Sequence, residues 1–111
     1  MRWFGALRRS GEIASVRRRG RAASFAGFSV FAAPGSRETL VCVSVSKAVG
    51  GAVVRNRVRR RIRGALEALP AAATPVRLLF VAKPAASALS YERLLGDVRT
   101  ALERSVTSPR S

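Results

Sequence analysis

The stretch GGAVVRNRVRRRIRGAL, from Gly50 to Leu66, places six arginines within the nine residues 55–63. Its apolar residues nevertheless form one narrow stripe when they are set on a helical period. The members of this stripe recur at steps of four, four, four and three residues: Val54, Val58, Ile62, Leu66 and Leu69. Because such a stripe packs against a neighbouring layer while the charged side chains stay in solvent, the segment predicts an amphipathic helix.

The arginines of this predicted helix all lie off the apolar stripe. They divide between its two flanks and the opposite side: Arg55, Arg59 and Arg63 on one flank, Arg57 and Arg61 on the other, and Arg60 opposite the stripe. Like charges four residues apart cost about 0.2–0.5 kcal/mol per pair. Glu67 is the only acid between Lys47 and Glu92. An uncompensated cationic ridge on a helix is typical of a surface that docks phosphates, whereas an ordinary solvated face mixes in acids.

Two residues near this segment each allow a structural and a functional interpretation. Asn56, between Arg55 and Arg57, either bonds a free backbone N–H at the start of the helix or contacts RNA with its amide. Cys42, the single cysteine, lies in the apolar run 39–46 and is expected as a small buried residue rather than a nucleophile. A single cysteine forms no internal disulfide, which fits a reducing compartment.

Charge dominates the composition of the whole chain, which has 111 residues and a formal net charge of +15. Lysine and arginine total 21 against six acids, and the lysines among them are Lys47 and Lys83. Self-repulsion from such an excess destabilises a compact fold, so a polyanionic partner is expected, nucleic acid before an anionic membrane surface. The arginine and alanine content equally fits a GC-rich genome, and one sequence does not separate the two explanations.

Apolar patterning on both sides of the arginine segment predicts a single small α+β domain, with helices packed on a mostly antiparallel sheet. The element order is α-β-β(-β)-α-β-α, with helices expected at 10–19, across the arginine segment and at 90–104, and strands at 24–33, 39–46 and 76–82. The first two strands, joined by the short turn 34–38, predict a hairpin. Ser10 and Ser90 are candidate helix caps.

The two ends of the chain are expected to lie outside the packed domain. Residues 1–9 are predicted to form a loose basic arm, and residues 105–111 a tail. The RNA-binding domain itself is expected at residues 10–104. No run reaches the ~18 apolar residues of a membrane span, and the N-terminus lacks a signal-like apolar core. A cytoplasmic location is therefore expected.

Residues that would carry out hydrolysis are missing or scattered. The chain contains no histidine, and its six acids show no metal-ligand spacing. No zinc signature and no phosphate-cradling glycine motif occurs in the sequence. We therefore expect neither an active site nor a bound metal in this protein.

The segment VSVSKAVGGAVVRNRVRRRIRGAL, residues 43–66, closely resembles the signature of the bacterial ribonuclease P protein subunit. The positions that match are Lys47, Gly50, Ala52, Val53, Arg55, Asn56, Arg57, Arg60 and Arg63. The resemblance extends over residues 7–104 and includes the apolar strand and the closing amphipathic helix. It implies a left-handed crossover from the strand before the arginine helix to the strand after it, although the general rule favours the right-handed form.

The same resemblance implies a function in transfer RNA maturation, as an accessory subunit of an endoribonuclease. In the family, an RNA subunit and its Mg²⁺ ions remove the 5′ leader of precursor tRNA, and the protein binds both the catalytic RNA and the leader. The residues expected to bind RNA are Lys47, Arg55, Asn56, Arg57, Arg59, Arg60, Arg61 and Arg63. A leader cleft is expected at Ile13, Arg17 and Phe31. The expected partners are ribonuclease P RNA and precursor tRNA, with neither a membrane nor a protein partner.

The chain departs from the family pattern at four positions. Ala48 stands where a second lysine is common, and Gly51 stands at a site that is often basic or polar. Ile13 stands where the family favours phenylalanine, and Arg17 where another apolar or aromatic residue is common. The last two positions border the leader cleft, so the departures concern leader contacts more than binding of the catalytic RNA.

Two other classes of function fit a basic helix. One is a structural, ribosomal-type RNA-binding protein with no part in RNA processing. The other is a helix-turn-helix protein that binds duplex DNA. The strands on both sides of the arginine helix disfavour the DNA binder, and the Arg-Asn-Arg motif with the apolar strand after it favours the ribonuclease P subunit over the structural protein.

Overall fold

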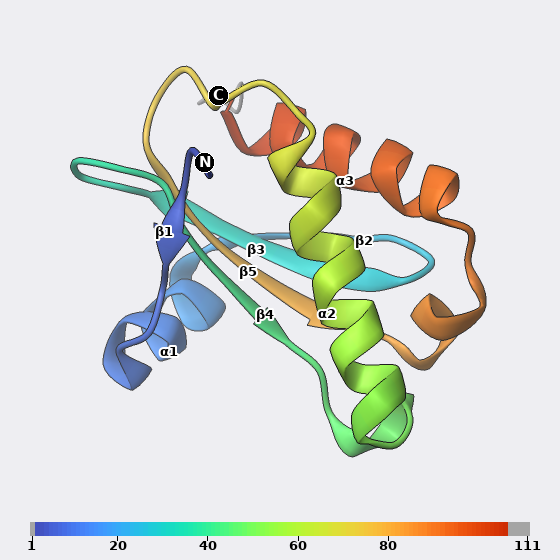
Figure 1. Cartoon of the computed structure of the whole chain (residues 1–111). Helices are drawn as coiled ribbons and strands as arrows, with labels where there is room; N and C mark the ends of the chain where they lie inside the picture. The colour runs from blue at the N-terminus through green and yellow to red at the C-terminus, as the bar shows by residue number, and fades with distance from the viewer. Residues whose placement is uncertain (1, 107–111) are drawn as a thin grey trace.

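Alternating and continuous apolar runs assemble residues 2–106, the part of the chain that the computed structural model describes, into one sheet with helices on both faces (Figure 1). The strands are β1 (Gly5–Ala6), β2 (Arg21–Ser24), β3 (Phe28–Pro34), β4 (Leu40–Ser44) and β5 (Val76–Ala82). The helices are α1 (Ser10–Arg19), α2 (Ala52–Glu67) and α3 (Tyr91–Val106), with short 3-10 helices η1 (Lys47–Val49) and η2 (Pro84–Ala88). The predicted α+β class is confirmed.

The strands lie in the order β1-β4-β5-β3-β2. β4 pairs in parallel with β1 and β5, while β3 pairs antiparallel with β5 and β2. The sheet is therefore mixed: most of its paired residues are antiparallel, as expected, but it is not wholly antiparallel. The expected hairpin between the strands at 24–33 and 39–46 is wrong, because β5 lies between β3 and β4. β5 takes the central place since its nearly continuous apolar sequence is buried on both faces.

The connection from β4 through α2 to β5 is left-handed, as the family resemblance implies. In Figure 1, α2 crosses in front of the sheet, and the arrows of β4 and β5 both point to the lower right. When these arrows are turned to point upward, β5 lies to the left of β4 as seen from the α2 side. A right-handed crossover would place β5 to the right.

Period-two alternation sends the side chains of the central strands to opposite faces of the sheet. On one face, Phe28 and Phe80 belong to the main core, which also holds the apolar residues of α2 and α3. On the other face, Leu79 forms a smaller cluster with Val16 of α1. Figure 1 accordingly shows α2 and α3 on one side of the sheet, toward the top of the view, and α1 on the other side, below it.

The N-terminal segment is part of the fold rather than the loose arm expected for residues 1–9. Its residues Gly5 and Ala6 form β1, which pairs with the beginning of β4. Phe4 and Leu7, on either side of this strand, are buried. A strand of two residues between arginines leaves almost no periodic pattern, which explains why the sequence does not reveal it.

Two further boundaries in the N-terminal half differ from the expectation. The strand expected at 24–33 is interrupted at residues 25–27, where the chain turns between β2 and β3. These two strands form the hairpin that the sequence predicted elsewhere. α1 matches its predicted range, but Arg9 rather than Ser10 holds the N-cap position, and no side chain caps the helix.

The C-terminal helix α3 begins with the expected cap. The Oγ of Ser90 accepts a hydrogen bond of 3.1 Å from the backbone N–H of Arg93. α3 runs to Val106, beyond its predicted end at Arg104. Residues 107–111 of the expected tail lie outside the described part of the chain.

Candidate nucleic-acid interface

The apolar stripe of α2 anchors this helix on the sheet, as its spacing predicts. Val58, Ile62 and Leu66 are buried in the main core, with exposed fractions of 1%, 0% and 0%. Val54 is half-buried at the N-terminal end of the stripe. Burying an aliphatic side chain of this size contributes about 1.5–3 kcal/mol, so the stripe outweighs the repulsion among neighbouring arginines.

The arginines of α2 point away from the core, although not all to the same degree. Arg57 and Arg60 are exposed, whereas Arg55, Arg59 and Arg63 are half-buried beside the sheet. Within residues 2–106, none of the six arginines of α2 forms an ion pair with a carboxylate. Their charges are therefore not neutralised by the protein itself, which leaves them available to an external anion.

Two of the residues predicted to bind RNA also hold other groups of the chain. Arg61 donates a hydrogen bond of 3.0 Å from Nη1 to the carbonyl oxygen of Leu89, which ties α2 to the segment before α3. Arg59 donates from Nη1 to Oδ1 of Asn56 at 2.9 Å. Gly51 holds the N-cap position of α2, so Asn56 does not cap the helix and instead orients Arg59. Direct contact of Asn56, Arg59 or Arg61 with RNA stays a prediction.

The half-buried residues Arg55, Arg59 and Arg63, called the arginine flank from here on, lie four residues apart on one side of α2, and Arg59 and Arg63 border the outer edge of β4. Burial raises the pKa of the Cys42 thiol, while Arg63 and Arg59 oppose this rise, which places both guanidinium groups near Cys42 on β4. Within residues 2–106, β1 pairs only with the first two residues of β4. The remaining residues of β4 therefore form the edge of the sheet beside the arginine flank.

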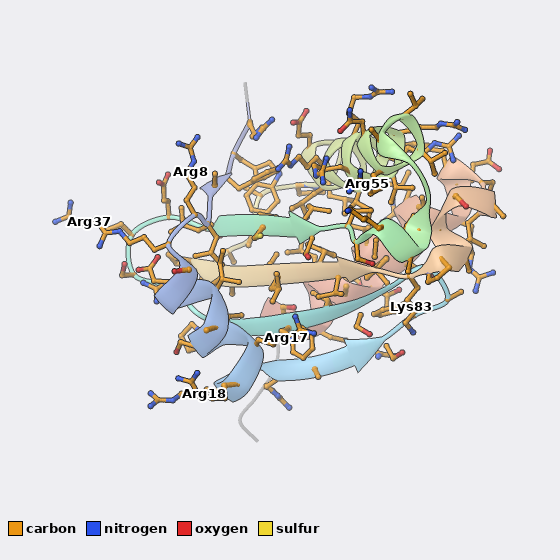
Figure 2. The ribbon with its side chains drawn as sticks, turned by 90° about the horizontal axis from the view of Figure 1, so that it is seen from below. Arg8, Arg17, Arg18, Arg37, Arg55 and Lys83 are labelled. Atoms are coloured by element: carbon orange, nitrogen blue, oxygen red, sulfur yellow. The ribbon has the colours of Figure 1, made fainter. Side chains whose placement is uncertain are left out.

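Arg55 has an unsatisfied donor. Its Nε is buried and finds no hydrogen-bond partner within residues 2–106. A buried guanidinium N–H without an acceptor is costly. In Figure 2, Arg55 lies at the end of the sheet where α2 begins.

The segment between β4 and α2 brings Lys47 to the start of the arginine helix. The Oγ of Ser46 accepts a hydrogen bond of 3.3 Å from the backbone N–H of Ala48, which initiates η1. Gly50 then adopts a φ of +154°, and a Cβ atom there would come within 2.9 Å of the Val54 side chain. Glycine is required at this corner, and Lys47 stays exposed beside it.

The three residues predicted for the leader cleft come together on the face of the sheet that carries α1. Ile13 and Phe31 are half-buried against the smaller cluster. The Cζ atom of Arg17 lies 5.7 Å from the centroid of the Phe31 ring, within reach of a cation–π contact. Figure 2 looks onto this face: α1 crosses one end of it, Arg17 lies over the sheet, and Arg55 and Lys83 stand at the opposite end.

Two residues that hold the C-terminal end of α2 were not predicted from the sequence. The indole N–H of Trp3 donates a hydrogen bond of 3.1 Å to the carbonyl oxygen of Leu66, and Arg2 pairs with Glu67 at 3.0 Å. The one available signal was a lone tryptophan in a basic segment. Because the last carbonyls of a helix lack partners within the helix, these contacts help to keep α2 ordered to its end.

The acids of the chain do not gather at a site. Within residues 2–106, no group of three or more histidine, cysteine or acidic side chains is close enough to hold a metal ion. Glu12 lies 3.7 Å from Arg77, Glu67 pairs with Arg2, and Asp97 pairs with Arg93 on α3. In the same described part of the chain, no helix has the length and apolar character that a membrane crossing requires.

The fold and the charge together define a small α+β RNA-binding protein, with an arginine helix docked on a mixed sheet. The family model described as Ribonuclease P matches residues 2–106. The ribonuclease P protein component of Roseiflexus castenholzii is 38% identical over 101 residues, which cover 88% of this chain and 83% of that protein. That of Chloroflexus aggregans is 36% identical, covering 88% and 75%. The chain belongs to the ribonuclease P protein family, as its signature predicts.

Solved structures share the architecture. The ribonuclease P protein of Staphylococcus aureus superposes with a TM-score of 0.81 at 17% identity, covering 97% of this chain and all of that one (100%). The protein of Thermotoga maritima gives a TM-score of 0.76 at 16% identity, covering 89% and 96%. At these identities the likeness concerns the fold, and it confirms the predicted fold class.

Proposed function

We propose that this protein is the accessory subunit of a ribonuclease P in which a catalytic RNA cuts the substrate. Membership in the family makes the chain a protein component of this tRNA-maturing endoribonuclease. The proposal concerns the division of labour: the protein binds the catalytic RNA through α2 and holds the 5′ leader of precursor tRNA on the sheet. The arginine flank carries the proposal, because its three guanidinium groups have no carboxylate partner within residues 2–106.

The arginine flank suits the phosphates of a folded RNA. Each guanidinium presents a planar fork of donors that matches the geometry of a phosphate group. Because the apolar stripe holds α2 rigidly, the three groups keep their spacing and lose little conformational freedom on binding. Lys47, Arg57 and Arg60 are exposed on the adjoining surface and extend the same positive field.

The single-stranded leader is assigned to the part of the sheet face that α1 leaves uncovered. Phe31 offers an aromatic ring there, and stacking of one base on such a ring contributes ~1–3 kcal/mol. Arg17, above that ring, adds a positive charge and a second planar surface. Ile13 supplies apolar contact but no ring, so base stacking in this chain depends on Phe31 and Arg17.

Cleavage is assigned to the RNA and to Mg²⁺ ions that the RNA holds. Hydrolysis needs groups that activate water, and this chain has no histidine. The acids Glu12, Glu67 and Asp97 are each engaged by an arginine. The protein assists indirectly, because neutralised phosphates repel each other less and the RNA then needs less Mg²⁺ to fold. This role also implies a cytoplasmic location, where tRNA precursors are processed.

A cleavage assay tests the proposal. Precursor tRNA is incubated at low Mg²⁺ with the ribonuclease P RNA of the same genome, with and without the protein. We expect faster leader removal when the protein is present, and no cleavage by the protein alone. If the protein binds this RNA without raising the rate, a structural, ribosomal-type role would be favoured instead.

A further inference from the structure

A cavity beside Trp3 lies apart from both surfaces described above. Its volume is about 390 Å³, within the range of small ligand pockets. Trp3, Ala72 and Pro75 form apolar walls, and Arg37 and Glu38 provide charged groups at its rim. An aromatic surface next to one cation and one anion offers each part of a nucleotide a partner: the ring for the base, the cation for the phosphate, and the carboxylate for an amino group.

Trp3 is held in a fixed orientation. Its indole N–H is used in the hydrogen bond to the carbonyl oxygen of Leu66, and its ring meets the Phe4 ring edge-on, with centroids 5.3 Å apart and an interplanar angle of 85°. The indole also packs against the main core, yet it is half-buried and still lines the cavity. A fixed aromatic ring loses little conformational freedom when a ligand stacks on it.

The two charged groups at the rim are available to a ligand. Arg37 and Glu38 are exposed, and neither forms an ion pair within residues 2–106. The Glu38 carboxylate sits beside Gly5, where a Cβ atom would lie 3.1 Å from its Oε2. Arg37 extends from the connection between β3 and β4 (Figure 2). The buried Thr39 also lines the cavity, and its Oγ1 accepts a hydrogen bond of 3.2 Å from the backbone N–H of Val76.

The cavity lies further along the sheet edge that the arginine flank borders. The flank borders the outer edge of β4, and β1 pairs with the beginning of that same edge. Trp3 comes just before β1 and contacts the C-terminal end of α2, where Arg2 neutralises Glu67. An RNA strand that follows the flank toward the end of α2 therefore reaches the cavity.

We infer that this cavity binds one unpaired nucleotide of the RNA that the arginine flank contacts. The base stacks on Trp3, Arg37 contacts the phosphate, and Glu38 accepts a hydrogen bond from an exocyclic amino group. Cytosine is preferred over uracil, because a carboxylate accepts from the N4 amino group of cytosine, whereas uracil presents a carbonyl oxygen at the same position. This inference rests on the RNA-binding role of α2 proposed above.

Fluorescence tests the site directly, because Trp3 is the only tryptophan of the chain. The full chain is titrated with hexacytidylate and hexauridylate RNA, and binding is followed in parallel by the anisotropy of a labelled hexamer. We expect saturable quenching of Trp3, with hexacytidylate bound at least about five-fold more tightly than hexauridylate. Glu38→Gln should abolish this preference, because an amide donates as well as accepts.

A matched pair of charge variants separates the cavity from general electrostatics. Arg37→Ala should weaken hexacytidylate binding more than Arg99→Ala, which removes the same charge from the exposed surface of α3. Both variants keep Trp3 and its contact with α2. Binding without a change in fluorescence, equal reductions for the two variants, or no hexamer binding at all would overturn the inference. A separate titration with ribonuclease P RNA shows whether the role of α2 holds independently.

Discussion

Helices α1 and α2 are both basic, yet the sheet holds them very differently. α2 buries four of its residues: Val58, Ile62, Ala65 and Leu66. Within residues 10–19, which form α1, Val16 alone is buried. The arginines of α1 fall in its last turn, where the helix dipole favours cations, whereas the six of α2 occupy residues 55–63 and none lies in its last turn. A helix that carries uncompensated charge along its length needs a deep apolar anchor, and a helix with a short basic end does not.

Under the proposed function, this difference suits the two helices to different kinds of RNA. A rigid helix presents charges at fixed spacing, which matches a folded RNA whose phosphates are also fixed. α1 rests on the sheet through a small cluster, beside the face proposed above for the single-stranded leader. Matched substitutions in α1 and α2 should therefore separate these roles, and the first pair has the largest expected effect.

Anchoring is compared by making the same substitution in both helices. Ile62→Ala, at a fully buried position of α2, should lower the free energy of unfolding by about 2–5 kcal/mol. Ile13→Ala, at a half-buried position of α1, should cost less than half as much, because part of that side chain already contacts water. Chemical denaturation measures both values. Equal decreases would show that the two helices are anchored alike.

The electrostatic comparison uses two double variants that remove the same charge. Arg59→Ala with Arg63→Ala should weaken binding of ribonuclease P RNA and flatten its salt dependence by roughly 0.7–0.9 log units for each phosphate that is no longer neutralised. Arg18→Ala with Arg19→Ala, on the exposed end of α1, should change the slope much less. Affinities measured over a series of salt concentrations give both slopes. An unchanged slope for the α2 variant would mean that the flank faces away from the RNA.

The leader face is tested by shortening the side chain on which a base would stack. Phe31→Leu keeps apolar packing in the smaller cluster but removes the aromatic ring. We expect about five-fold weaker binding of precursor tRNA with a long leader, which corresponds to the lower end of base stacking. A precursor with a leader of a single nucleotide serves as the control and should be unaffected. A similar weakening for both substrates would place the effect outside the leader.

The smallest expected effect concerns Cys42 and reports on the position of the arginine flank. Burial raises the pKa of this thiol, and Arg63 and Arg59 hold the rise in check. Replacing both arginines with alanine should raise the pKa further and slow alkylation at mildly alkaline pH, because the thiolate is the reactive form. The pH dependence of the alkylation rate measures the shift, and the Arg18 and Arg19 variant is the control. A faster reaction in the flank variant would contradict the placement.

The raised pKa of Cys42 also predicts how the free energy of unfolding changes with pH. A thiol whose pKa is higher in the folded than in the unfolded state favours folding most while it is protonated. Its contribution is therefore complete at neutral pH and is lost as the pH rises through the folded-state pKa of Cys42. Cys42→Ala should show a smaller decline in unfolding free energy over that alkaline range.

Local periodicity was sufficient to predict the helix and the strand whose apolar patterns are long and regular. The stripe from Val54 to Leu69 predicted α2, and the apolar run 76–82 predicted β5 with the observed bounds. The signature around Arg55 to Arg57 identified the family. These signals depend on residues close in the chain, since helical and strand periods are properties of neighbouring positions.

Contacts between distant segments decided the remainder, because nothing in a local pattern encodes which strands become neighbours. β5 separates β3 from β4, and the segment around Phe4 adds β1 to the edge of the sheet. The contact of Trp3 with the end of α2 likewise joins segments that are far apart in the chain. The amino-acid sequence by itself determined which helix carries the charge and which side of it is apolar. Tertiary packing decided what that charge lies beside, since burial of apolar surface from several strands at once selects a single arrangement.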